Sequence, residues 1–208
     1  FADFTDRIIH VIVDDQPIDK GAWEAEFYSR NAIQKGLVNT NENDLLIISD
    51  VDEIPNPEII RNYNSDEPKV LVQRLYYYFV NCQQNQLWNG SIITKKKHLT
   101  SPQELRNQRD QLPKIPNGGW HFSFLGGAER IVSKIKAYAE TETCNERTTS
   151  VDLIKNKILN GEDIFDRTDE YAQKKFVGID ETFPQQIKGF IGKYPDLYHS
   201  SDKNVVNP

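Results

Sequence analysis

Three carboxylates stand close together in this sequence, at Asp50, Asp52 and Glu53, directly after a short apolar stretch. The preceding residues 45–48 are apolar on both faces, which is typical of a strand buried in a sheet between helices. Acids at the carboxyl end of such a strand lie where open α/β sheets bind ligands. Two carboxylates this close repel unless a cation holds them, and Mg²⁺ or Mn²⁺ suits oxygen ligands shared with substrate phosphates. The spacing therefore predicts a metal–diphosphate site, against the simpler alternative of a solvated, helix-capping turn.

The first third of the chain is predicted to alternate strands and helices. Residues 7–13 are apolar and β-branched and predict a strand, and a helix follows over 21–35. On that helix Trp23 and Phe27 are expected in the core. After the buried strand, Asn56 followed by proline predicts the start of a short helix that runs to about residue 63.

The middle of the chain predicts a β-hairpin, with strands over 69–80 and 91–97 and a loop over 83–90. Further elements are a helix that begins at the Ser101 capping box and ends near 110, a loop over 113–119, a strand over 120–125, a helix after Gly127 with Ile131, Ile135 and Tyr138 on one face, a helix capped by Ser150 that ends at Gly161, and mostly loop from Gly189 onward. The pattern predicts an α/β fold with a mixed sheet.

Composition sets further bounds. The 208 residues predict one domain over 1–199 and a disordered tail over 200–208. The net charge of −6 argues against a nucleic-acid partner, and no apolar stretch approaches the 18 residues of a transmembrane segment. Cys82 and Cys144 have neither metal spacing nor a disulfide framework and are expected to be free, buried thiols. The chain starts without methionine, so it is interpreted as a piece of a longer protein, truncated at the N-terminus.

Two longer motifs carry a resemblance to a known family. The first is Trp23-Glu24-x-Glu26-x-x-x-Arg30-Asn31-Ala32 followed by Ile48-Ser49-Asp50-Val51-Asp52-Glu53-Ile54-Pro55, and the second is Gly118-Gly119-Trp120-His121-Phe122-Ser123-Phe124-Leu125-Gly126-Gly127 before a helix with Lys134-Ile135 and Tyr138-Ala139. In this order they resemble glycosyltransferase family 17. Its named members are β-1,4-mannosyl-glycoprotein β-1,4-N-acetylglucosaminyltransferases, which add the bisecting GlcNAc to N-glycans. The resemblance runs from about Ile8 to Phe165.

The resemblance implies a GT-A-like fold, a mixed sheet with flanking helices. Relatives usually begin with another strand–helix–strand segment that helps to form the nucleotide pocket, and this chain lacks it. The resemblance also implies a UDP-sugar donor, with GlcNAc as the sugar, a glycan acceptor, Mn²⁺ or Mg²⁺, and inversion at the anomeric carbon. A microbial enzyme of this kind would work in the cytoplasm and an animal one in the Golgi lumen.

In this interpretation the acids take separate roles. Asp52 is the direct metal ligand, and Asp50 contacts the metal through water or contacts the donor ribose. Glu53 is a third catalytic acid, or alternatively a charge near the start of the next helix. An inverting transfer needs a base on the acceptor hydroxyl, and Asp163, just past a helix end, is the first candidate; the alternative is an ordinary turn acid.

Four more residues have two interpretations each. His121 is a metal or phosphate contact, or a hydrogen-bonded core residue. Arg30 and Lys134 pair with the acids or with the diphosphate, or are solvated. Trp120 is a core residue or a platform on which a sugar stacks.

Two other function classes remain open from the sequence. A haloacid-dehalogenase-type phosphohydrolase also has an apolar strand before Asp-x-Asp, with one aspartate as nucleophile. Against it, Glu53-Ile54-Pro55 stands where a small residue and threonine are expected, and no later Gly-Asp-x-x-x-Asp motif follows. The third class is a non-catalytic module that binds a nucleotide-sugar or a metal.

Overall fold

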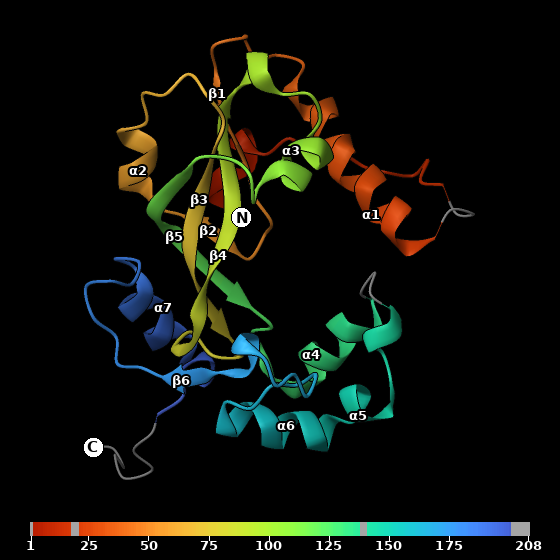
Figure 1. The fold of residues 1–208 in the computed structure, drawn as a ribbon, viewed down its shortest axis with the longest axis vertical. Coiled ribbons are helices and arrows are strands. Elements are labelled where there is room, and N and C mark those ends of the chain that lie inside the picture. Colours follow the sequence, from red (N-terminus) through yellow and green to blue (C-terminus); the bar gives the residue numbers. More distant parts are fainter. Residues whose placement is uncertain (1, 18–20, 138–140, 201–208) are drawn as a thin grey trace.

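The computed structural model describes residues 2–17, 21–137 and 141–200, and a twisted sheet runs through its centre (Figure 1). The strand order is β1-β4-β3-β5-β2, and β6 also pairs with β4. The strands are β1 Leu45–Ile48, β2 Glu53–Pro55, β3 Lys69–Tyr77, β4 Cys82–Lys95, β5 Lys114–Ser123 and β6 Lys174–Phe176. β3 runs parallel to β5, and the other pairs are antiparallel. The predicted α/β class with a mixed sheet is confirmed.

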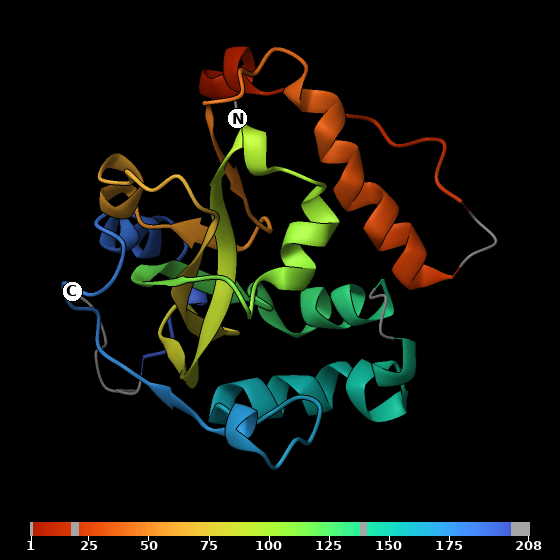
Figure 2. The same ribbon diagram turned by 45° about the horizontal axis from the view of Figure 1, so that its top comes forward.

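Helices cover both faces of this sheet (Figure 2). On one side lie α1 (Ala22–Asn31), α3 (Pro102–Gln108) and α4 (Gly127–Lys136), and α2 (Pro57–Arg61) and α7 (Ile187–Lys193) lie on the other. The short α5 (Glu146–Thr149) leads into α6 (Val151–Asn160), which packs against α4.

Two apolar clusters hold the helices to the sheet. One joins α4 and α6 to the hairpin end of β3 and β4, through residues such as Ile135 and Ile154. The other lies on the side of α7 and includes Tyr76 and Phe183. Burial on both faces of β3 follows from its central place, with a strand hydrogen-bonded on each side.

Local capping signals predicted the helix boundaries well. The side chain of Asn56 accepts from Glu58 N at the start of α2, and that of Ser101 accepts from Glu104 N at the start of α3. Ser150 likewise caps α6, and Gly161 ends it in the left-handed region with φ 70°. These motifs need only neighbouring residues, so they can be recognised without the tertiary fold.

The N-terminal prediction was wrong. Residues 2–7 form a 3-10 helix, and the described segment 8–13 has no strand, so the side chains of Ile9 and Ile12 are 68% exposed. An apolar β-branched run favours extended backbone, but a strand also needs a neighbour with which to pair. Trp23 and Phe27, expected in the core, pack on each other at 6.2 Å between ring centroids and are 42% and 37% exposed.

Other corrections concern the strands. β1 lies antiparallel at the edge of the sheet and is not enclosed between parallel strands. The predicted loop 83–90 belongs to β4, where buried Gln84 gains a hydrogen bond to Tyr171 O at 2.7 Å, so the hairpin turns at 78–81 instead. β5 begins at Lys114 and includes most of the predicted loop 113–119.

At the C-terminal end, α7 occupies 187–193, where loop was expected from Gly189. Both cysteines are free as predicted, although Cys144 is exposed and only Cys82 is buried. Tyr138 and residues 201–208, for which a core position and a disordered tail were predicted, lie outside the described residues.

Candidate functional site

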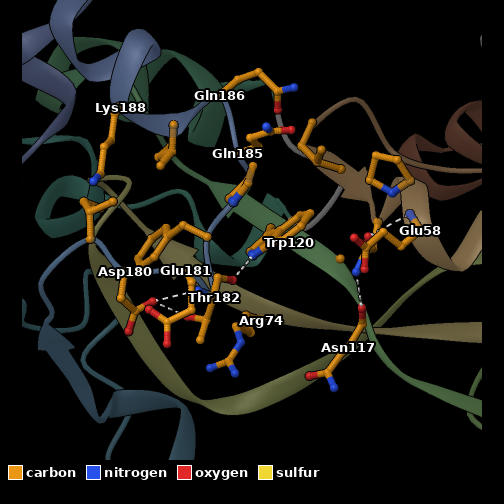
Figure 3. A pocket seen from close by; sticks show the side chains of 18 of the residues that line it. Glu58, Arg74, Asn117, Trp120, Asp180, Glu181, Thr182, Gln185, Gln186 and Lys188 are labelled. Atoms are coloured by element: carbon orange, nitrogen blue, oxygen red, sulfur yellow. Dashed lines mark hydrogen bonds between the residues drawn. The ribbon is translucent and has the colours of Figure 1, made fainter.

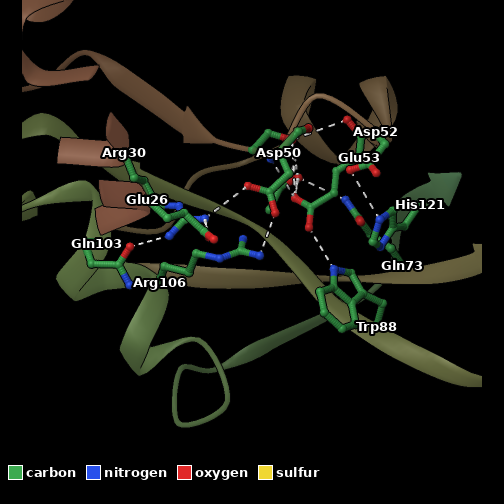
Figure 4. A network of polar contacts seen from close by, with 12 residues as sticks. Glu26, Arg30, Asp50, Asp52, Glu53, Gln73, Trp88, Gln103, Arg106 and His121 are labelled. Atoms are coloured by element: carbon green, nitrogen blue, oxygen red, sulfur yellow. Dashed lines mark hydrogen bonds and ion pairs between the residues drawn. The ribbon is translucent and has the colours of Figure 1, made fainter. Parts of the chain in front are cut away.

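The acids Asp50 and Asp52 lie in the turn between β1 and β2, and they point in different directions (Figure 4). Glu53 N donates to Asp50 O at 3.0 Å, which closes the turn, and Phe122 N donates to Asp52 O at 2.9 Å, which fixes it on β5. Because the backbone turns here, the two carboxylates do not share one strand face, as a regular strand would require. Each meets its own cationic partners.

Asp50 faces α1 and α3. The guanidinium of Arg106 on α3 lies 2.6 Å from Asp50 Oδ2, and that of Arg30 on α1 lies 4.0 Å from Oδ1. Arg30 is held in turn by Glu26 at 2.5 Å and by Gln103. The predicted pairing of Arg30 with the acids is therefore present, and two helices converge on one carboxylate.

Asp52 faces β5 and α4. His121 Nε2 lies 3.3 Å from Asp52 Oδ1, and Lys134 Nζ lies 3.1 Å from Oδ2. Burial raises the pKa of the Asp52 carboxyl, but the hydrogen bonds and charges of His121 and Lys134 outweigh burial and hold this pKa well below its usual range. Asp52 is therefore ionised throughout the physiological range, and with 23% of its side chain exposed it is open to a ligand.

Glu53 lies beneath the turn, at the start of β2, and is 4% exposed. Its carboxylate accepts from Trp88 Nε1 at 2.7 Å, from Ser91 Oγ at 3.0 Å and from Asp50 N at 3.2 Å. A buried carboxylate with several donors fixes the parts that supply them. Glu53 thus anchors the turn to β4, which is neither the open catalytic acid nor the helix-start charge that were considered.

His121 stands between Asp52 and the ring of Trp88, whose centroid is 5.1 Å from its own. It is buried, and its Nδ1 finds no hydrogen-bond partner within the described part of the chain. The structure therefore supports both of its interpretations at once, because it is a core residue that contacts the acid nearest to Lys134.

The fit of a divalent cation can be judged from these ligands. Among the described residues no group of three or more histidine, cysteine or acidic side chains is arranged to hold a metal. A closed, all-protein centre therefore does not fit. A cation of the Mg²⁺ type, which keeps several waters and binds through one or two carboxylates plus substrate phosphates, does fit the oxygens of Asp50 and Asp52.

Asp163 lies elsewhere, after α6, and its carboxylate is 3% exposed. It accepts from Arg167 Nη2 at 2.6 Å and from Lys174 Nζ at 2.9 Å, and Lys174 is fully buried. Burial raises the pKa of Asp163, but the hydrogen bonds from Arg167 and Lys174 outweigh it and lower this pKa to about 2. A buried, paired carboxylate of such low basicity is suited to holding the fold, so the structure argues against the predicted base role.

Arg106, Trp88 and Ser91 belong to the site but were not identified from the sequence. Arg106 is on a helix recognised only by its cap, and nothing local indicates that it reaches Asp50. Trp88 falls in the polar stretch assigned to a loop. Its one signal was an indole among amides, since a buried tryptophan usually finds an acceptor.

Comparison with known proteins gives one finding. The family model described as Glycosyltransferase family 17 matches residues 1–187, and neither the curated proteins nor the solved structures give a match. The matched range contains the turn with Asp50 and Asp52, both arginines and Lys134. None of the helices in the described ranges has the length and apolarity needed to cross a membrane. The match covers most of the 208 residues, and the chain therefore belongs to glycosyltransferase family 17.

Proposed function

We propose that this chain moves a sugar, GlcNAc by analogy with the named members of the family, from a UDP-sugar to a glycan acceptor with inversion, on a GT-A-like scaffold. The observation that carries the proposal is the turn at residues 50–52, where two ionised carboxylates lie among three basic side chains and one histidine. A nucleotide diphosphate with its cation requires both kinds of charge in one place.

In this proposal Asp52, assisted by Asp50, holds Mn²⁺ or Mg²⁺. The cation, when bound, neutralises charge on the leaving diphosphate. Lys134 and Arg106 contribute donors to phosphate oxygens, and guanidinium groups do so in paired geometry. In the structure these cations contact the carboxylates, so they lie within reach of any phosphate that enters between them. His121 keeps Asp52 oriented through its contact with Oδ1.

Two alternatives were kept open by the sequence. The phosphohydrolase requires its aspartates after a central parallel strand, whereas β1 is an antiparallel edge strand and the family is a glycosyltransferase family. We therefore set it aside. The non-catalytic binding module is decided by experiment.

The test is calorimetric titration of the chain with UDP-GlcNAc, UDP-glucose and GDP-mannose, each with and without Mn²⁺, followed by a transfer assay on N-glycan acceptors. We expect binding of a UDP-sugar that depends on Mn²⁺ and turnover in its presence. Asp52→Asn keeps the shape but removes the charge, and should weaken binding at least tenfold.

Asp166→Asn is the matched control, because Asp166 also pairs with a lysine and an arginine but lies on the far side of α6, away from the turn. It should bind like the unaltered chain. Mn²⁺-dependent binding without any turnover would favour the non-catalytic module. Absence of nucleotide-sugar binding by the folded chain would contradict the donor site.

A further inference from the structure

A large groove lies on the opposite face of β2 and β5 from the carboxylate turn. It has a volume of about 1370 Å³ and is enclosed by α2, β5 and the segment 179–188 that leads into α7 (Figure 3). Neighbouring residues of a strand point to opposite faces. Ile54 and Trp120 therefore line the groove, whereas Glu53 and His121, their neighbours, belong to the site described above.

The indole of Trp120 forms the floor of this groove (Figure 3). Its Nε1 donates to Thr182 O at 2.8 Å, and its ring packs against the cluster that contains Phe183. The ring is only partly buried, so part of it faces the groove. A tryptophan fixed by packing and by a hydrogen bond offers a rigid, flat apolar surface that costs little conformational entropy on binding.

Charges along the groove cancel. Its acids are Glu58, Asp180 and Glu181, and its bases are Arg61, Arg74 and Lys188. A surface for a nucleotide, a phosphate or another polyanion needs an excess of positive charge, which this groove lacks. The lining therefore favours a neutral ligand.

Amide side chains complete the lining at Asn56, Asn117, Gln185 and Gln186. Amides carry donors and acceptors side by side, as do pairs of neighbouring hydroxyl groups on a ligand. The volume exceeds the roughly 300–1,000 Å³ of pockets for small molecules, so the ligand is longer than a single sugar ring. An aromatic floor, neutral charge and amide rims together match a polyhydroxylated chain.

We propose that this groove binds a neutral oligosaccharide, with one ring stacked on Trp120, at a site separate from the one that holds the donor. The inference goes beyond sugar transfer, since such binding needs neither nucleotide nor metal. It also gives the second interpretation of Trp120, the sugar platform, a defined place. Because the groove and the turn lie on opposite faces, each can be altered without touching the other.

The test is direct binding, measured by calorimetry and by tryptophan fluorescence without nucleotide or metal. The probes are neutral tetrasaccharides of β-linked GlcNAc, β-linked glucose and α-linked mannose, and a neutral N-glycan core. A sulfated tetrasaccharide serves as the anionic comparison. We expect at least one neutral probe to bind, and the anionic one to bind at least tenfold more weakly.

Two variants probe the groove. Trp120→Ala removes the floor, and the double variant Glu58→Ala with Gln185→Ala alters only exposed side chains of the rim. Both should weaken binding at least tenfold. The double variant guards against a packing defect in the first. Trp23→Ala, which removes an exposed tryptophan of α1 outside the groove, is the matched control and should change nothing.

Asp52→Asn separates this inference from the proposed transfer activity. It should abolish nucleotide-sugar binding and leave oligosaccharide binding intact. Failure of every neutral probe to bind the folded chain, equal binding by both groove variants, or a preference for the sulfated probe would each overturn the proposal.

Discussion

Lys134 Nζ lies 3.1 Å from Asp52 Oδ2, although the two residues are 82 positions apart in the sequence. Lys134 is near the end of α4, whose apolar face is buried through Ile131 and Ile135. The position of the ammonium group therefore depends on packing of the helix against the sheet. The contact couples the carboxylate turn to an element that the chain forms much later.

Replacing Lys134 with methionine should raise the pKa of Asp52 toward its ordinary value. The ammonium group favours the ionised carboxylate both by its charge and by its hydrogen bond. Carboxyl ¹³C NMR of the aspartates as a function of pH would measure the change. Lys136→Met, an exposed lysine on the same helix, is the control. An unchanged Asp52 titration in Lys134→Met would show that His121 alone sets this pKa.

Replacing Trp88 with phenylalanine should lower the free energy of unfolding by about 1–3 kcal/mol, because buried Glu53 then loses the donor to its Oε1. Denaturant unfolding followed by circular dichroism would measure the loss. Trp23→Phe, on an exposed indole that packs only on Phe27, should cost much less. Equal costs in the two variants would contradict the anchoring role of Glu53.

Replacing Asp163 with asparagine should destabilise the fold by about 3–5 kcal/mol, because it leaves the buried Lys174 ammonium without its carboxylate. Asp166→Asn, at an exposed ion pair, should cost no more than about 1 kcal/mol. Thermal unfolding compares the two. A base role for Asp163 would give the opposite result, with transfer abolished and stability unchanged.

The same residue predicts a dependence of stability on pH. The pKa of Asp163 is about 2 in the folded chain, below its value of about 3.9 when unfolded, so ionisation favours the folded state. This contribution is complete above about pH 4 and is lost as the pH falls from about 4 to 2. Unfolding free energies measured across that range should fall less steeply in Asp163→Asn.

Replacing Gly119 with alanine should disrupt the pairing of β2 with β5. Gly119 has φ +147°, and a Cβ there would lie 2.2 Å from the carbonyl oxygen of Ile54. We expect a loss of more than about 2 kcal/mol in stability. Gly178→Ala is the control, because its Cβ would have no neighbour within 4 Å. Equal stability of the two variants would contradict the close approach of the strands.

Features that depend on nearby residues were predictable from the sequence. The caps at Asn56, Ser101 and Ser150 use hydrogen bonds within three residues, and the Gly161 stop needs only its own backbone. The acids of the turn could be found for the same reason, since they are adjacent in the chain.

Features that depend on distant partners were not predictable. The run at 7–13 has strand character but no strand beside it, and Gln84 lies in a strand because Tyr171 O is there to accept its hydrogen bond. Arg106 reaches Asp50 because α3 packs beside α1. Asp163 had the sequence context of a loop acid, yet Arg167 and Lys174 enclose it.

Trp120 and His121 are consecutive residues of β5, one in the groove and the other beside Asp52. Their Cα atoms are about 3.8 Å apart, joined by a planar peptide. A sliding of β5 along its own axis would therefore displace the indole and the imidazole by the same amount and in the same direction. Mechanically, the strand is a common shaft for the two faces of the sheet.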